Sequence, residues 1–235
     1  MKIGVLETGA SPRALQSAFG RYPAMFERLM AAPGDQWVTY DVRKAAFPQA
    51  VDECAAWVVT GSAAGVYDQA PWISPTMDFL RQAKGRAALI GICFGHQMMA
   101  QAFGGEAVKS PKGWGIGLHR YQVASRRPWM DDTATIAAPA SHQDQVVRAP
   151  PGAMVLAANH FTPFGMLAYD DQRAVSLQLH PEFEPDFAAA LIEARGATRY
   201  GEGPARAATA SLTAASDGRR VGRWLRTFLE TASVI

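Results

Sequence analysis

Short apolar runs rich in β-branched residues alternate with helical patterns along the N-terminal part of the chain. The strand-like runs cover residues 3–6, 37–42, 57–60 and 88–92, and apolar residues have helical spacing over residues 23–30 and 75–83. Two parallel strands need a long crossover connection, which a helix supplies. This alternation therefore predicts βαβ units and a mainly parallel sheet.

The middle of the chain has a different pattern. Strand-like runs at residues 113–123, 134–137, 154–158, 166–169 and 174–179 are joined by loops too short to contain helices. They predict either antiparallel additions to the edge of the sheet or a small second sheet. The expected fold class is thus α/β, with a flavodoxin-like, mainly parallel sheet that is flanked by helices and carries an antiparallel extension.

The C-terminal part predicts two clear helices with an indistinct segment between them. Residues 185–194 open with a proline, which the first helical turn tolerates, and Asp217 is the expected N-cap of a closing helix with one apolar face. Residues 195–216 are rich in Ala, Gly and Thr and have weak periodicity, so they predict either a mobile loop or a marginal helix. They carry no visible chemistry. We expect residues 1–235 to form a single domain.

Composition and charge exclude several classes of function. Of the 235 residues, 49% are hydrophobic and 19% are charged, which suits one α/β domain with a substantial core. The 23 Lys and Arg residues are balanced by 21 Asp and Glu residues and form no basic run, so nucleic acid is not an expected partner. Because no cationic leader and no bilayer-length apolar stretch occur, we expect no membrane association and a cytoplasmic location.

The most informative segment surrounds Cys93. An apolar strand runs into Gly91, Cys93 and Gly95 and then into a helical pattern, which is typical of a nucleophile on a strand-to-helix elbow. Glycines two residues to either side remove Cβ atoms that would clash in so tight a turn, and the dipole of the following helix favours the thiolate. The backbone N–H of Phe94 becomes available for an oxyanion. Cys54 has no such elbow and is interpreted as a buried structural residue.

A cysteine nucleophile needs a base, and among the five histidines only His180 leaves a strand end with an acid beside it. The proline between His180 and Glu182 is expected to keep the chain extended, so that both side chains project to the same side. Glu182 would then accept the Nδ1 proton and leave Nε2 for the thiol. Since the carboxyl ends of parallel strands meet at one edge of a sheet, Cys93 and His180 are expected to lie together.

A polar cluster formed by Ser141, His142, Gln143 and Asp144 lies between two strand-like runs. The residues alone leave two interpretations open: a turn that satisfies its own hydrogen bonds, or a loop that recognises substrate. The remaining histidines are interpreted as ordinary helix, strand or loop residues.

The elbow at residues 91–97 is followed much later by His-Pro-Glu at residues 180–182. In the order and approximate separation of a Cys-His-Glu triad, here Cys93, His180 and Glu182, the chain resembles the class I glutamine amidotransferases. The resemblance covers most of the chain. The turn at residues 60–62 is similar to the oxyanion turn of that family. This similarity implies that the Ser62 backbone N–H is a second oxyanion donor and that Gly61 permits the turn.

The resemblance also implies a substrate pocket. Gln97 corresponds to a family residue that contacts bound glutamine. Residues 111–117 and 141–146 resemble the glutaminase domain of GMP synthetase and its stand-alone relatives, including the γ-glutamyl peptidases. Their likeness implies that the pocket includes Ser141, His142 and Asp144.

The expected activity is Cys-dependent hydrolysis of the γ-amide of glutamine, or of a γ-glutamyl peptide or amide, through a γ-glutamyl thioester. No metal or organic cofactor is expected.

Two features depart from the family pattern: Leu179 stands where many relatives have Gly, and no synthetase domain follows before Ile235. The alternatives are a glutaminase that delivers ammonia to a separate synthetase partner, or an inactive binding or regulatory relative. Because the recognised pocket residues match positions near bound glutamine, the leaving-amine side is expected to be permissive.

Overall fold

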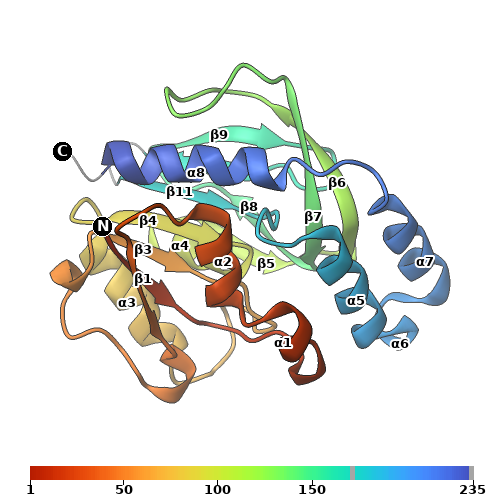
Figure 1. The fold of residues 1–235 in the computed structure, drawn as a ribbon, viewed down its shortest axis with the longest axis horizontal. Coiled ribbons are helices and arrows are strands. Elements are labelled where there is room, and N and C mark those ends of the chain that lie inside the picture. The colour runs from red at the N-terminus through yellow and green to blue at the C-terminus, as the bar shows by residue number, and fades with distance from the viewer. Residues whose placement is uncertain (170–172, 233–235) are drawn as a thin grey trace.

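A computed structural model describes residues 1–169 and 173–232, and its largest element is a mixed sheet (Figure 1). Among the described residues, nine strands are hydrogen-bonded in the order β2-β1-β3-β4-β11-β10-β9-β6-β7. One half of the sheet is parallel and the other half antiparallel, and a separate apolar core lies on each face. The expected α/β class with an antiparallel extension is confirmed.

The parallel half contains the strands that the N-terminal alternation predicted, together with the last of the middle runs, which was expected in an antiparallel addition or a second sheet but pairs in parallel with β4. These strands are β2 (Gln36–Tyr40), β1 (Lys2–Leu6), β3 (Ala56–Val59), β4 (Ala88–Ile92) and β11 (Ala174–Leu177). Strands β3, β4 and β11 are wholly buried, because both faces of the sheet are covered there. Since β4 and β11 are parallel neighbours, the residues that follow them meet at one edge of the sheet.

Of the two arrangements that the sequence left open for the middle runs, the structure shows the first, because all of these runs join the large sheet. The antiparallel half of the large sheet contains β10 (Met166–Tyr169), β9 (Ala153–Ala158), β6 (Gly115–Val123) and β7 (Thr135–His142). A second sheet pairs β5 (Glu106–Lys109) with β8 (Asp144–Arg148), neither of which the sequence predicted. Strand β7 extends to His142, well past the expected end at residue 137, and so carries the polar cluster to the edge of the sheet.

Helices cover the two faces of the sheet. On one face α2 (Tyr22–Met30), α5 (Pro185–Arg195) and α8 (Gly218–Ala232) contribute to a common core, and on the other α3 (Ile73–Ala83) and α4 (Phe94–Ala102) do so. The remaining helices are α1 (Arg13–Phe19), α6 (Ala197–Tyr200), α7 (Glu202–Ser211) and two short 3₁₀ turns, η1 (Val42–Lys44) and η2 (Val51–Glu53). No helix within the described ranges is long and apolar enough to cross a bilayer.

For residues 195–216 the structure shows the helical one of the two alternatives. Residues 195–216 contain helices α6 and α7, and α7 is fastened to β6 because the Ser211 hydroxyl accepts the Leu118 N–H at 2.8 Å. Asp217 precedes α8 as expected, but its carboxylate accepts the N–H of Ala137 in β7 at 2.9 Å. The N–H of Gly218 donates instead to the Ser216 hydroxyl at 3.1 Å. Asp217 is therefore at the N-cap position of α8, where its carbonyl accepts the Val221 N–H at 3.0 Å, but its side chain ties the helix to the sheet.

Candidate active site

Cys93 occupies the turn between β4 and α4, where its backbone has φ 54° and ψ −100°. This is a sparsely populated conformation for a residue with a side chain. The flanking glycines make it sterically feasible: a Cβ on Gly91 would lie 2.6 Å from the Gly95 carbonyl oxygen, and one on Gly95 would lie 2.3 Å from that of Val59. The elbow therefore depends on both glycines, as the sequence pattern predicts.

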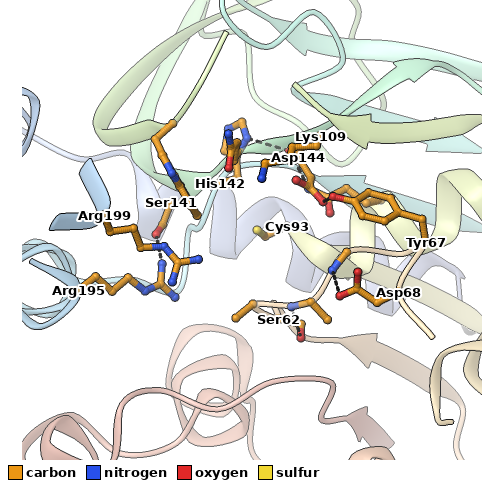
Figure 2. Close-up of a pocket in the computed structure, with 16 residues that line it drawn as sticks. Ser62, Tyr67, Asp68, Cys93, Lys109, Ser141, His142, Asp144, Arg195 and Arg199 are labelled. Atoms are coloured by element: carbon orange, nitrogen blue, oxygen red, sulfur yellow. Dashed lines mark hydrogen bonds between the residues drawn. The ribbon is translucent and has the colours of Figure 1, made fainter. Parts of the chain in front are cut away.

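The thiol of Cys93 lies at a charged cavity of about 190 Å³ (Figure 2). We call it the Cys93 cavity; besides Cys93 it is lined by residues 62–65, 67–68, 97, 109, 114, 141–144, 195 and 199. A small hollow next to it is lined by Cys93 and His180 together with Gly61 and Ser62. The structure thus brings the predicted nucleophile, base and oxyanion turn to one place.

His180 is held by a carboxylate and by an aromatic ring. Its Nδ1 lies 2.7 Å from Oε1 of Glu182, and its ring stacks on Phe183 with a centroid separation of 4.0 Å. The expected reason for the His180–Glu182 contact is wrong, because the chain is not extended there: the Phe183 N–H donates to the His180 carbonyl at 3.3 Å, which closes a turn. A turn that begins at His180 brings the two side chains together instead.

Electrostatics at this site favour a charged imidazole. Burial by itself lowers the pKa of His180, but the negative charges of Glu182 and Cys93 and hydrogen bonds to both outweigh it, and the net pKa is raised well above the ordinary value. His180 is only 3% exposed, so little solvent screens these charges. An imidazolium next to a thiolate is the arrangement that nucleophilic cysteines require.

The turn at residues 60–62 is fixed by the segment that follows β1. Thr8 donates its N–H to the Thr60 hydroxyl at 3.0 Å and its own hydroxyl to the Thr60 carbonyl at 2.8 Å. A Cβ on Gly9 would lie 2.4 Å from the Gly61 carbonyl oxygen, so this contact requires glycine. Within the described residues, the backbone N–H of Ser62 donates to no acceptor.

The N–H of Phe94 is the other expected oxyanion donor. It begins α4 next to the Cys93 thiol and likewise has no acceptor among the residues that the structure describes. The side chain of Phe94 is fully buried and packs 5.5 Å from the ring of Trp72, so only its backbone is at the site. Unpaired N–H groups beside a nucleophile suit a developing negative charge.

The other expected pocket residues also line the Cys93 cavity, but not all are free for a ligand. Gln97 Nε2 donates to the Asp144 carbonyl at 2.8 Å, and His142 Nδ1 lies 3.1 Å from the same oxygen. The Asp144 carboxylate accepts the Tyr67 hydroxyl at 2.8 Å. The Ser141 hydroxyl accepts Nη1 of Arg195 at 2.7 Å. These hydrogen bonds therefore hold the backbone and side chains of the cluster in position.

Burial sets the protonation of two residues in this cluster. His142 is 3% exposed, and burial, helped by the neighbouring His119, lowers its pKa to about 3. Burial raises the pKa of Asp144, against the opposing effects of the Tyr67 hydrogen bond and the Lys109 charge. His142 is thus a neutral hydrogen-bonding residue at neutral pH.

Sequence reasoning missed the charged and aromatic residues around the rim of the Cys93 cavity. These are Tyr67, Asp68, Lys109, Trp114, Arg195 and Arg199. Lys109 is the register partner of Asp144 in the small sheet, and Arg195 and Arg199 come from the segment that carried no visible chemistry. Nothing in the local sequence marks the two arginines, because they belong to different helices and reach the cavity only through the packing of α5 and α6 beside the elbow.

Comparison with known proteins gives two kinds of relative. The chain is 26% identical over 187 residues to γ-glutamyl peptidase 4 of Arabidopsis thaliana, which covers 76% of the chain and 74% of the relative. It is 32% identical over 128 residues to a glutamine-hydrolysing GMP synthase of Trichormus variabilis, which covers 53% of the chain but only 22% of that longer protein.

The fold and the family are supported independently. The structure superposes on a glutamine amidotransferase from Thermotoga maritima with a TM-score of 0.73 over 99% of the chain and 98% of that protein, at 16% identity, which speaks for the fold alone. The family model for glutamine amidotransferase class-I matches residues 38–195, more than half of the chain. The chain therefore belongs to the class I glutamine amidotransferase family.

Proposed function

We propose that this chain hydrolyses the γ-amide bond of glutamine or of a γ-glutamyl peptide or amide, through a γ-glutamyl thioester on Cys93. One observation carries the proposal: Cys93, on a strained turn at a charged cavity, has His180 beside it, and that imidazole is held 2.7 Å from Glu182. The family and the γ-glutamyl peptidase relative favour the same chemistry.

In the first half of the reaction the Cys93 sulfur attacks the γ-carbonyl carbon. The carbonyl oxygen becomes an oxyanion that accepts the N–H groups of Ser62 and Phe94. His180 gives its Nε2 proton to the leaving nitrogen, so the C–N bond breaks and ammonia or an amine departs. The glutamyl group remains bound to sulfur as a thioester.

In the second half, water replaces the amine. Neutral His180 takes a proton from the water as its oxygen attacks the thioester carbonyl, and the same N–H groups hold the second oxyanion. The C–S bond breaks, which releases glutamate and restores the thiolate and imidazolium. Glu182 keeps Nδ1 protonated throughout and so fixes the tautomer and ring orientation.

We assign recognition of the glutamyl group to one side of the Cys93 cavity, formed by Asp68, Gln97, Lys109, His142 and Asp144 and called the glutamyl wall. The carboxylates of Asp144 and Asp68 suit an α-ammonium group, and the Lys109 ammonium beside Asp144 suits the α-carboxylate. Gln97 and His142 order the Asp144 backbone and complete this wall. A pocket of this kind rejects analogues that lack either charge, because its own polar groups would then be left unpaired.

The test is to incubate purified protein with glutamine, γ-glutamylglycine and α-glutamylglycine while measuring both ammonia and glutamate. We expect cleavage of γ-linked substrates and at least about a hundredfold slower cleavage of the α-linked dipeptide, since its scissile carbonyl is attached directly to the α-carbon. Equal rates for the two dipeptides would reject the assigned glutamyl wall. No cleavage of any γ-linked substrate would reject hydrolysis by the isolated chain.

The second candidate is a glutaminase that supplies ammonia to a separate synthetase, and the sequence similarity to a glutamine-hydrolysing GMP synthase favours it. It predicts that glutamine hydrolysis by the purified chain is negligible and appears when a cell-extract fraction is added. If the purified protein released ammonia from glutamine as fast without the extract fraction as with it, the partner-dependent glutaminase would be rejected.

A further inference from the structure

Two arginine side chains face the Cys93 cavity without carboxylate partners. Arg195, at the end of α5, and Arg199, in α6, both line the cavity, and neither forms an ion pair within the described part of the chain. Arg195 uses Nη1 for the Ser141 hydroxyl, at 2.7 Å, and the Tyr200 hydroxyl, at 3.3 Å. Its Nε and Nη2 donate to no other described residue.

Arg199 is positioned by an aromatic ring. Its guanidinium carbon lies 4.5 Å from the centre of the Trp114 ring, and that ring packs edge-on against Tyr200 at 5.2 Å. A cation–π contact of this kind positions a guanidinium without using its N–H donors in hydrogen bonds. Arg195 and Arg199 therefore present unpaired donors at the rim of the same cavity, a geometry that suits a carboxylate.

Cys93 lies between the two arginines and the carboxylates that line the cavity (Figure 2). Figure 2 shows Arg195 and Arg199 on one side of Cys93, with Tyr67, Asp68 and Asp144 on the other. The α-ammonium and α-carboxylate groups of a glutamyl substrate are bonded to a single carbon, so both must bind at the same end. Asp144 and Lys109 already supply both complementary charges there. The arginines thus lie where the leaving amine would be.

We propose that Arg195 and Arg199 bind a carboxylate on the leaving amine, so that the preferred substrates are γ-glutamyl amino acids and peptides rather than glutamine or γ-glutamyl derivatives of uncharged amines. This inference rests on the proposed γ-glutamyl hydrolysis. It replaces the expectation that the leaving side is permissive. Arg195 and Arg199 would act as specificity residues that touch the substrate without taking part in proton transfer.

The experiment compares two substrates that differ only in charge on the leaving side, γ-glutamylglycine and γ-glutamylglycinamide. Wild-type kcat/KM should be about tenfold to a hundredfold higher for the free carboxylate, the usual effect of one or two charge-assisted hydrogen bonds. Arg199→Gln should lower kcat/KM for the free carboxylate far more than for the amide, and so remove most of that preference. Arg199→Lys should retain part of it. Arg206→Gln, an exposed arginine on α7, is the matched control and should leave both rates alone.

The outcomes separate the inference from the function on which it rests. Equal wild-type rates for the two substrates would overturn the carboxylate site while leaving γ-glutamyl hydrolysis intact. If Arg199→Gln and Arg195→Gln slowed both substrates equally in folded protein, the arginines would belong to the glutamyl end, and the inference would be wrong. Cleavage of neither substrate by wild-type protein would overturn the proposed function and this inference with it.

Discussion

The backbone of Cys93 is held at φ 54° by neighbours that leave it little freedom, at a cost of about 1–3 kcal/mol for a residue with a side chain. The cost is offset by what the turn provides: a sulfur at the mouth of a cavity, an imidazole beside it and a free N–H on the next residue. Each of these groups has a distinct role in the proposed reaction, and substitutions should therefore have unequal effects.

Removing the nucleophile or the base should be far more harmful than weakening the orienting group. Cys93→Ala and His180→Ala are each expected to lower kcat on the order of a thousandfold or more, whereas Glu182→Gln should do less damage because the amide still accepts a hydrogen bond. Steady-state hydrolysis of γ-glutamylglycine measures this, with circular dichroism to confirm folding. Full activity in Cys93→Ala would end the proposal.

Glu182→Gln should also change the pH profile in a defined direction. The carboxylate is the main charge that raises the pKa of His180 against the opposing effect of burial, so its neutralisation lowers that pKa. Imidazolium is then lost at lower pH, and the basic limb of kcat/KM should move down by at least about one pH unit. Glu184→Gln is the matched control, because that glutamate is exposed and its ion pair is with Arg219 on the surface. An unmoved basic limb would show that Glu182 does not set the charge of His180.

At the scale of elements, the attachment of α7 to β6 holds the arginine-bearing segment in place. Gly117 in β6 has φ +87°, and a Cβ there would lie 2.6 Å from Ser211 Oγ and 2.8 Å from Ala208 Cα. Gly117→Ala should therefore lower the free energy of unfolding by about 2–4 kcal/mol, from backbone strain and displacement of α7.

Gly203 offers an internal control for that prediction. It lies in α7 with nothing within 4 Å of an added Cβ. Gly203→Ala should raise the free energy of unfolding by up to about 1 kcal/mol, because alanine loses less backbone entropy in a helix. Urea denaturation of both variants gives the comparison. Equal effects would mean that the close approach of α7 and β6 does not contribute to stability.

The elements with a strong local signal could be predicted from the sequence, and those defined by long-range contacts could not. Strand β4 (Ala88–Ile92) has the expected bounds because a buried parallel strand is one continuous apolar run. Strands β5 and β8 are short and carry charged residues, so only their pairing with each other identifies them. Helix α6 is too brief for any periodicity to appear.

The same distinction holds for the site. The elbow and the His180–Glu182 pair are local patterns, and both are present, although the pair is formed by a turn rather than an extended segment. Arg195 and Arg199 have no local signal of function, because their meaning comes from packing of α5 and α6 beside a nucleophile about a hundred residues earlier.

At the scale of the whole molecule, two buried histidines should make the fold sensitive to acid. Burial lowers the pKa of both His96 and His142 to about 3. In the unfolded chain a histidine titrates near pH 6.5, so between roughly pH 6.5 and 3 the unfolded state binds more protons. The stability that each neutral histidine contributes is therefore complete above about pH 6.5 and is lost as pH falls, by about 1.4 kcal/mol per pH unit.

His96 is the better residue for testing this, because it lies outside the proposed reaction. Its Nδ1 is 2.7 Å from the Ser176 hydroxyl, a contact that glutamine can imitate. In His96→Gln the slope of unfolding free energy against pH should be smaller by about 1.4 kcal/mol per pH unit between about pH 4 and 6. Replacement of the exposed His160 by Gln should leave the slope in place. An unchanged slope in His96→Gln would contradict neutral burial of His96.

The central claim is that Cys93 attacks the γ-carbonyl of a glutamyl group, and the site of covalent capture by a glutamine-mimicking diazoketone tests it most directly. Cys54, the other cysteine, is a built-in control, because it is 3% exposed, does not line the Cys93 cavity, and has its pKa raised by burial. We expect peptide mass spectrometry to find one adduct per chain, on Cys93, at neutral pH, and γ-glutamylglycine to slow its formation. An adduct on Cys54, or none on either cysteine, would contradict the account.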